Sequence, residues 1–278
     1  LLLGLAGLLE LRTGSVSMGW SLMFYITAGL FIMIFLYHKF ILPRPSGDRK
    51  LSGDTQVTFL SSVRDFLKTF ATFFTKKAAV ISILFMLLYR LPEALLAKVC
   101  PLFLLDKTSA GGMGLTTAQL GFAQGTVGVI GLTIGGILGG IAASRGGLKK
   151  WLWPMVAAIS IPDSVYIYMS FADNVSFSLL NALIFLEQFG YGFGFTAYML
   201  FLIYYSRGES KTAHYAICTA FMALSMMIPG LFAGYLQMNL GYKSFFILTM
   251  ALCLVTVAVS AFIKVDPDFG KKNTEEKE

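Results

Sequence analysis

Seven long apolar stretches are the feature that most constrains this 278-residue chain. Each approaches or exceeds the roughly 20 apolar residues with which a helix crosses a bilayer. The stretches, whose ends are set to within a few residues, are 19–37, 78–104, 117–142, 151–170, 176–205, 213–237 and 244–263. They are too long for the strands of a membrane barrel and do not alternate between polar and apolar residues. We therefore predict an all-α, polytopic membrane protein with about seven transmembrane helices.

The composition favours the same class of protein. Hydrophobic residues make up 56% of the chain and charged residues 13%, about half the roughly 25% charge of soluble domains. Disordered, collagen-like and disulfide-framework proteins are thereby excluded. The net charge of +7 would suggest a nucleic-acid partner in a soluble chain. Here the basic residues lie in loops between apolar stretches, so no nucleic-acid partner is expected.

Neither the cysteines nor the histidines form a recognisable metal or redox motif. Cys100, Cys218 and Cys253 lie in separate apolar runs, and His38 and His214 are the two histidines of the chain. The cysteines are expected to be small residues that pack between helices. We predict no metal site and no cofactor.

The lysines and arginines predict the orientation in the membrane. When sides are assigned alternately along the seven stretches, 17 basic residues fall on the side of residues 38–77 and 3 on the other. Basic residues collect in cytoplasmic loops. The side that holds residues 38–77 and the C-terminus is therefore predicted to be cytoplasmic.

The only long loop, within 38–77, carries a helical pattern of apolar residues, with Arg64, Asp65 and Lys68 on the other side. The apolar residues are Phe59, Leu60, Val63, Phe66, Leu67, Phe70, Phe73 and Phe74. The pattern predicts an amphipathic helix on the cytoplasmic membrane surface. Docking of this helix on soluble protein is the alternative. The tail that follows Lys264 is expected to be disordered.

The third stretch is rich in glycine. Its glycines, which fall within about half of the helix circumference, are Gly121, Gly125, Gly128, Gly131, Gly135, Gly136, Gly139 and Gly140. Such a stripe lets another helix approach closely. It indicates either tight static packing or a smooth surface on which two helix bundles rock.

The loop that follows runs Gly140-Ile-Ala-Ala-Ser144-Arg145-Gly146-Gly147-Leu148-Lys149-Lys150. It resembles the cytoplasmic signature of the major facilitator superfamily, Gly-x-x-x-Asp-Arg-x-Gly followed by two basic residues. Gly140, Arg145 and Gly147 match, Ser144 replaces the aspartate, and the basic pair is displaced by one residue. The resemblance implies that the three matching residues serve the conformational change.

In that family a weaker copy of the signature follows helix eight, so the third stretch resembles helix eight. The resemblance then implies four segments and further N-terminal helices before Leu1. These segments are 1–41, the tail of helix five and helix six; 42–77, a cytoplasmic linker with the amphipathic helix; 78–264, the C-terminal six-helix bundle; and 265–278, a cytoplasmic tail. Residues 1–9 are expected to be the tail of helix five.

Three stretches are similar to the muropeptide permease (AmpG) branch of this family, which has relatives that resemble acetyl-CoA transporters. They are residues 88–104 with Tyr-Arg-Leu-Pro-Glu-Ala, residues 186–197 with Glu-Gln-Phe-Gly-Tyr-Gly, and residues 212–234 with Thr-Ala-His-Tyr-Ala. The resemblance implies a multi-pass protein of the bacterial inner membrane. It also implies proton-driven import of anhydromuropeptides for cell-wall recycling.

Arg90 and Glu93 lie near the middle of the second stretch. A charge there costs roughly 2.5–3.5 kcal/mol on insertion scales. Their spacing places both on one helix face, and Pro92 can loosen the backbone between them. We interpret Arg90 as attracting an anionic substrate group, with Glu93 as its counter-ion or as a proton carrier. The alternative is a self-satisfied pair that fixes the helix.

Glu187 is the second candidate, because it has no charged neighbour in the fifth stretch. A lone carboxyl group can load and release a proton as its surroundings change from wet to dry. Tyr191 and Tyr198 follow on the same helix face, where tyrosines suit sugar binding. With the adjacent Gln188 they complete the predicted substrate site. The alternative is an interhelix hydrogen bond from a permanently neutral glutamic acid.

Four further polar residues carry weaker signals. Lys98 can steer anions or merely extend to the membrane surface. Asp163 follows Pro162 and fits a helix kink as well as a functional role. Gln124 is expected to join helices by a hydrogen bond, and His214 to lie in an interface.

The predicted function is a secondary active transporter that works by alternating access. Its expected partners are a small anionic substrate, protons, the bilayer and the N-terminal helices of the same protein. Acyl-CoA and sugar phosphates are alternative cargoes, and a seven-helix receptor is a distant alternative. The sequence has no P-loop, HExxH or GxSxG motif. It therefore offers no support for an ATP-driven pump within this chain or for a hydrolase.

Overall fold

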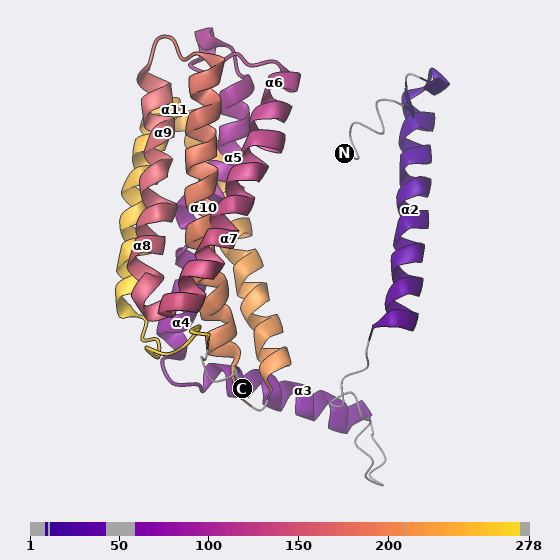
Figure 1. The fold of residues 1–278 in the computed structure, drawn as a ribbon, viewed down its shortest axis with the longest axis vertical. Helices are drawn as coiled ribbons and strands as arrows, with labels where there is room; N and C mark the ends of the chain where they lie inside the picture. Colours follow the sequence, from indigo (N-terminus) through magenta and orange to yellow (C-terminus); the bar gives the residue numbers. More distant parts are fainter. Residues whose placement is uncertain (1–8, 11, 43–58, 209, 273–278) are drawn as a thin grey trace. The chain divides into compact units, whose positions relative to one another are not determined.

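The computed structural model describes residues 9–10, 12–42, 59–208 and 210–272. The chain divides into two compact units, Leu1–Val57 and Thr58–Glu278 (Figure 1). The first unit contains helix α2 (Val16–Ile41), whose N-terminus is capped by the hydroxyl of Ser15, which accepts from the amide of Met18 at 3.4 Å. This helix confirms the first predicted stretch. The predicted tail of helix five falls almost wholly on residues 1–8, which lie outside the described residues.

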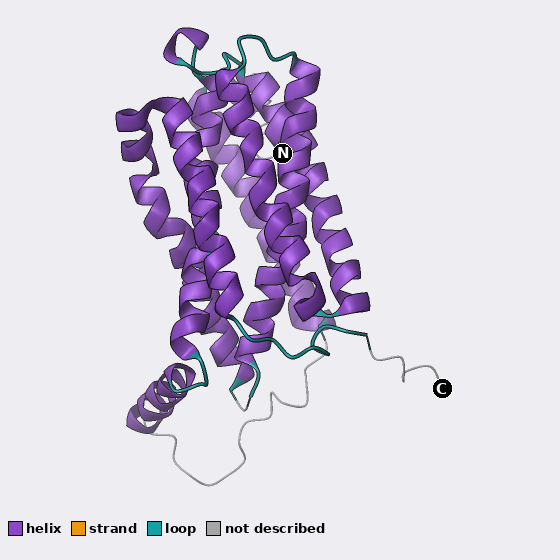
Figure 2. Cartoon of the chain, turned by 90° about the vertical axis from the view of Figure 1, so that its left-hand side faces the viewer, coloured by secondary structure: helices purple, strands orange, loops and turns teal. Residues whose placement is uncertain are grey.

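The second unit is built from helices joined by short loops, and its described part contains no strand (Figure 2). Its α-helices are α3 (Phe59–Phe74), α4 (Ala79–Leu88), α5 (Leu91–Leu105), α6 (Thr117–Phe122), α7 (Val129–Gly146), α8 (Leu148–Ser160), α9 (Ser164–Phe171), α10 (Phe177–Ser206) and α11 (Lys211–Phe262). A π-helical segment, Ala123–Gly128, joins α6 to α7, and a 3-10 turn, Ile161–Asp163, joins α8 to α9.

Four helical segments in the described part are long and apolar enough to cross a membrane: Ser17–Ile41, Ala79–Leu105, Thr117–Gly146 and Lys211–Phe262. The last contains two predicted stretches, because the backbone leaves the helical conformation at Gly241, where φ is 71°. The remaining two predicted stretches coincide with α8–α9 and with α10. The all-α, polytopic fold class is therefore confirmed.

The glycine stripe packs against α10 along one edge only. A Cβ atom on Gly131 would lie 2.7 Å from the carbonyl oxygen of Phe185, and one on Gly139 would lie 2.6 Å from Oγ1 of Thr196. These glycines serve tight static packing. The glycines that have no atom within 4 Å of a built Cβ are Gly121, Gly125 and Gly140. This open edge can contact another helix bundle, as is required if the stripe is a surface on which two bundles rock.

Two buried apolar clusters follow one another along the length of the bundle. One contains Phe85 to Tyr89 of α4 and its end, and the other contains Leu95 to Leu104 of α5. On α10 the same division falls between Ile184 and Ala197. Between α8 and α9 it falls at the 3-10 turn. A polar layer thus lies between two apolar clusters, and it contains the candidate charged residues of three helical elements.

Helix α3 lies across the ends of α10 and α11 (Figure 1). Phe73 is fully buried there against Tyr205, with ring centroids 5.3 Å apart. Nε2 of His214 lies 3.1 Å from the hydroxyl of Thr72, so His214 is an interface residue, as expected. The side chains of Phe59, Leu60, Val63 and Phe66, on which the amphipathic prediction partly rested, lie outside the described residues.

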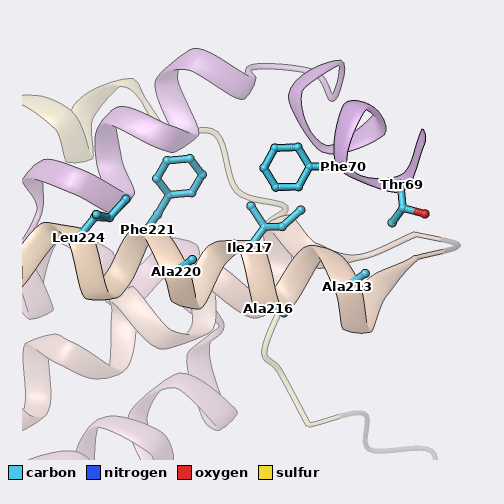
Figure 3. A pocket seen from close by; sticks show the side chains of 8 residues that line it. All are labelled: Thr69, Phe70, Ala213, Ala216, Ile217, Ala220, Phe221 and Leu224. Carbon is cyan, nitrogen blue, oxygen red and sulfur yellow. The ribbon is translucent and has the colours of Figure 1, made fainter. Parts of the chain in front are cut away.

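A groove of about 450 Å³ separates α3 from the first turns of α11 (Figure 3). Alanines along α11 form its floor, and Phe70 and Phe221 stand at its sides. Its lining residues are apolar apart from Thr69. The groove therefore offers no charged group that would recognise a substrate.

Residues 265–272 fold back onto the loop between α7 and α8. The amide of Leu148 donates to the carbonyl of Phe269 at 2.9 Å, and the amide of Lys272 donates to the carbonyl of Ser144 at 2.8 Å. The guanidinium of Arg207 lies 4.2 Å from the centroid of the buried Phe269 ring. The prediction of a disordered tail is wrong for these residues, because one aromatic anchor and backbone hydrogen bonds hold them. Residues 273–278 lie outside the described part.

Candidate functional site

The second predicted stretch is broken at the point where its charged residues lie. The backbone turns at Tyr89 and Arg90, and Pro92 stands in the first turn of α5. A broken helix releases carbonyl groups that need new donors. The hydroxyl of Tyr198 donates to the carbonyl of Met86 at 2.6 Å, and that of Thr256 donates to the carbonyl of Tyr89 at 3.0 Å. Neighbouring helices therefore stabilise the break.

Arg90 is buried among aromatic rings, with 7% of its surface exposed. Its guanidinium donates a hydrogen bond to the hydroxyl of Tyr191. Its Cζ atom lies 4.6 Å from the ring centroid of Phe195 and 5.8 Å from that of Tyr198. Its Nε has no hydrogen-bond partner. An ion pair with Glu93, one of the two roles considered for that residue, is not formed: among the described residues the ion pair found is Lys271–Asp268.

An open pocket of about 530 Å³ lies beside Arg90, between α7 and α10. Apart from Arg90, aromatic, aliphatic and small residues line it: Leu132, Gly136, Tyr191, Gly192, Phe195, Thr196, Met199 and Leu200. A cation on an aromatic wall attracts anions, and the rings offer faces on which sugars stack.

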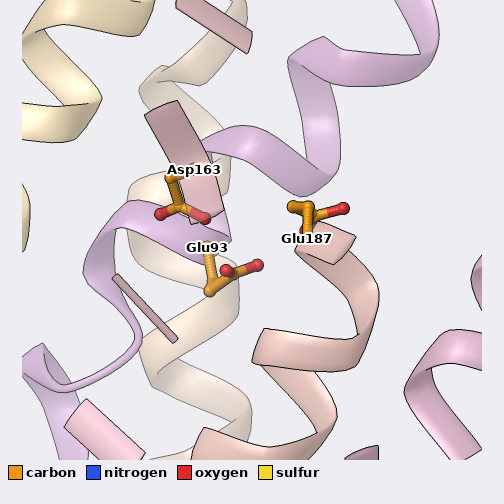
Figure 4. A group of neighbouring side chains, drawn as sticks. All are labelled: Glu93, Asp163 and Glu187. Atoms are coloured by element: carbon orange, nitrogen blue, oxygen red, sulfur yellow. The ribbon is translucent and has the colours of Figure 1, made fainter. Parts of the chain in front are cut away.

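Three carboxyl groups meet one helical turn away from Arg90. Oxygen atoms of Glu93, Asp163 and Glu187 all lie within 4.8 Å of one another (Figure 4). These side chains are 6%, 4% and 3% exposed. They come from α5, from the 3-10 turn and from α10, so three separate helical elements build the cluster. We call these three residues the carboxyl cluster.

Glu187 is held by two donors, whereas its neighbours are not fully satisfied. The hydroxyl of Tyr166 donates to Oε2 of Glu187 at 3.2 Å, and Nε2 of Gln188 lies 3.0 and 3.1 Å from the two carboxyl oxygens. By contrast, Oε1 of Glu93 and Oδ1 of Asp163 are buried without a partner. Unpartnered buried oxygens are costly, and they call for a missing ligand or proton.

A polar cavity of about 220 Å³ adjoins the carboxyl cluster. Glu93 and Glu187 line it together with Gln124, Gln188 and Tyr166. Tyr191 lines both this cavity and the pocket beside Arg90. One tyrosine ring therefore separates the basic part of the site from its acidic part.

The cluster can hold a cation or protons, although the sequence predicted no metal site. Three oxygen ligands from carboxyl groups suit hard cations. Two features of the sequence also point to this cluster. Asp163 stands in a predicted kink after Pro162, and Gln124 lies in the π-helical segment. Such π-helical turns often occur at functional sites.

The other predicted residues lie apart from these cavities. Tyr198 is fully buried behind Arg90, and its hydroxyl is occupied by the carbonyl of Met86. Lys98 is exposed further along α5. Arg145 is exposed at the end of α7, and Gly147 follows it with a φ of 77° that favours glycine. Gly140 has open space on its outer side.

A helix broken at a buried charge, within a polar layer between apolar clusters, is typical of membrane transporters. Comparison with known proteins agrees. The model of the Major Facilitator Superfamily matches residues 94–278. The Anhydromuropeptide permease of Escherichia coli (strain K12) is 22% identical over 234 residues, which cover 84% of this chain and 45% of the relative.

Rickettsia proteins are similar at the same level. "Putative transporter AmpG 4" of Rickettsia conorii (strain ATCC VR-613 / Malish 7) is 24% identical over 244 residues, covering 88% of this chain and 56% of the relative. "Putative transporter AmpG 1" of Rickettsia prowazekii (strain Madrid E) is 24% identical over 187 residues, covering 66% and 40%. The chain thus spans about half the length of the curated relatives it matches.

The chain belongs to the Major Facilitator Superfamily, a family of membrane transporters. This membership excludes the seven-helix receptor that the number of stretches had left open. It also accounts for the similarity of the loop at Gly140 to the family signature.

Proposed function

We propose that the complete protein imports anhydromuropeptides across the bacterial inner membrane, driven by the proton gradient. The C-terminus lies in the cytoplasm, as the basic loops indicate. The chain covers about half of its relatives, so helices from the other half supply the second wall of the substrate cavity. Alternating access then exposes the site to each side of the membrane in turn.

The observation that carries this proposal is the buried guanidinium of Arg90. Aromatic rings surround this guanidinium, and it has no carboxylate partner among the described residues. Burial of an unpaired charge is costly, and an anionic ligand offsets that cost when it binds. The peptide carboxylates of an anhydromuropeptide fit this role, and its sugar fits the faces of Tyr191 and Phe195.

Glu93 and Glu187 are the proposed proton carriers. They line the polar cavity on the far side of Tyr191, where water can reach them. Three carboxyl groups so close together, without an ion pair, cannot all be charged in an apolar helix bundle. Gln188 fixes Glu187 and borders the same cavity. Protonation there changes the charge beside the substrate site, and this supplies the coupling.

Acyl-CoA and sugar phosphates are the alternative cargoes, since each is anionic and carries a ring. The names of the relatives favour the muropeptide. A direct test is equilibrium binding to the purified complete protein in detergent, with anhydromuropeptide, acetyl-CoA and glucose 6-phosphate as separate ligands. We expect binding of the first alone and its loss in Arg90→Ala. Lys98→Ala is the matched control, because it removes an exposed cation from α5, the helix that Arg90 directly precedes. Binding that Arg90→Ala leaves unchanged would contradict the proposal.

A further inference from the structure

Asp163 is buried deeper in the carboxyl cluster than the cavity reaches. The cavity is lined by Glu93 and Glu187, and Asp163 is absent from its lining. Nevertheless Asp163 has an oxygen atom within 4.8 Å of both glutamates, and Figure 4 shows Glu93 and Asp163 beside each other. A proton from the cavity therefore reaches Asp163 only through the glutamates.

The hydrogen bonding divides the cluster into one satisfied member and two incomplete ones. Glu187 accepts from Tyr166 and Gln188. Asp163 accepts from the thiol of Cys253 through Oδ2, at 3.6 Å, whereas its Oδ1 has no partner. A proton on one of the two incomplete carboxyl groups turns an acceptor into a donor, and the other oxygen, directly or through one water, then has a partner.

In the described part of the chain no basic side chain forms an ion pair with Glu93 or Asp163. Arg90, which directly precedes α5, is near enough for its charge to act on Glu93. Its guanidinium nevertheless points at Tyr191 and Phe195. The other titratable groups that surround the pair are Cys100 of α5, Tyr166 of α9, Glu187 and Tyr191 of α10, and Cys253 of α11. None of these side chains carries a positive charge, so a proton is the available counter-charge.

We propose that Asp163 is a third proton carrier, which shares the transported proton with Glu93. This inference rests on the proposed function and deepens it. The step moves only a proton: the O–H bond breaks on Glu93 and forms on Asp163, and Glu93 regains its negative charge. Glu93 is then free to take up the next proton from the cavity. Asp163 stores a proton out of reach of water while access to the site switches from one side of the membrane to the other.

The test uses the complete protein in vesicles, with Asp163→Asn, Asp163→Glu and the control Asp173→Asn. Asp173 is an exposed aspartate beyond the end of α9. We expect Asp163→Asn to lose gradient-driven accumulation of anhydromuropeptide and to keep exchange of external for internal substrate, which needs no net proton movement. Asp163→Glu and Asp173→Asn should accumulate substrate as the unaltered protein does.

A second readout needs no substrate. The infrared spectrum of the unaltered protein should contain a carbonyl band of a protonated carboxylic acid that Asp163→Asn removes and Asp173→Asn keeps. Absence of that difference would overturn the inference, as would full accumulation by Asp163→Asn. Accumulation driven by Na⁺ and lost in Asp163→Asn would also overturn it, because the cluster would then hold a cation. If the unaltered protein neither exchanges nor accumulates anhydromuropeptide, the proposed function fails, and the infrared band still decides the role of Asp163.

Discussion

The guanidinium of Arg90 donates a hydrogen bond to the hydroxyl of Tyr191, and the ring of Tyr191 borders the cavity that contains Glu93 and Glu187. A single side chain therefore contacts the basic part of the site and also adjoins its acidic part. A substrate that displaces Tyr191 from Arg90 would also change the walls of the acidic cavity. This relationship offers a physical route by which cargo and proton can influence each other.

Substitution of Tyr191 by phenylalanine removes the hydrogen bond to Arg90 and keeps the ring. The guanidinium loses one anchor, so we expect substrate affinity to fall by about 1 kcal/mol, or roughly fivefold. Equilibrium binding to the complete protein measures this change. Tyr168→Phe serves as the control, because Tyr168 is an exposed tyrosine of α9. Equal effects of the two substitutions would contradict the role given to Tyr191.

The two edges of the glycine stripe respond differently to alanine. Gly131→Ala places a methyl group against the backbone of Phe185, and we expect a loss of about 1–3 kcal/mol in stability. Gly140→Ala meets open space within this chain. We expect it to keep the thermal unfolding midpoint and to slow transport. A fall of the midpoint in Gly140→Ala, with none in Gly131→Ala, would refute this division of the stripe.

Lys76 ties the turn between α3 and α4 to the end of α10. Its ammonium group donates to the carbonyl groups of Tyr205 at 2.7 Å and Arg207 at 2.9 Å. Lys76→Ala leaves these carbonyl groups without that donor, so we expect a loss of about 1 kcal/mol. The exposed neighbour Lys77 provides the control, with an expected change within about 0.5 kcal/mol. Thermal unfolding in detergent compares them, and equal midpoints would disprove the contact's contribution.

Phe269 anchors residues 265–272 to the bundle. Its ring is buried beside Tyr204 and Arg207, and truncation of a buried phenylalanine costs about 3–5 kcal/mol. We expect Phe269→Ala to lower stability by about 3 kcal/mol and to expose the segment to proteolysis. Phe262→Ala, at an exposed phenylalanine of α11, should change neither. Resistance of Phe269→Ala to proteolysis would show that the segment is held by other contacts.

The sequence predicted the helices well, because crossing a bilayer imposes length and hydropathy on every span. Of the two roles considered for Glu93, the structure does not form the ion pair with Arg90. Spacing of three residues implies one face only in a continuous helix, and the break at Tyr89 and Arg90 removes that premise. The approach of Asp163 to Glu93 joins residues 70 positions apart. No local pattern encodes such a contact, because it depends on how α5 and the 3-10 turn pack.

The folded C-terminal segment was missed for a related reason. Its composition is polar and charged, which is typical of disorder. One phenylalanine and the positive φ of Gly147 nevertheless let residues 265–272 pair with the loop after α7. One phenylalanine changes the composition of a charged stretch too little to predict that the stretch is folded.

The most direct test of the proposed function is uptake of labelled anhydromuropeptide into vesicles that contain the complete protein. Uptake is compared with and without an inward proton gradient, in the unaltered protein and in Glu187→Gln. We predict accumulation against a concentration gradient in the unaltered protein, abolished when the gradient is collapsed and absent in Glu187→Gln. Accumulation that persists without a proton gradient, or that Glu187→Gln leaves intact, would contradict proton coupling at this site.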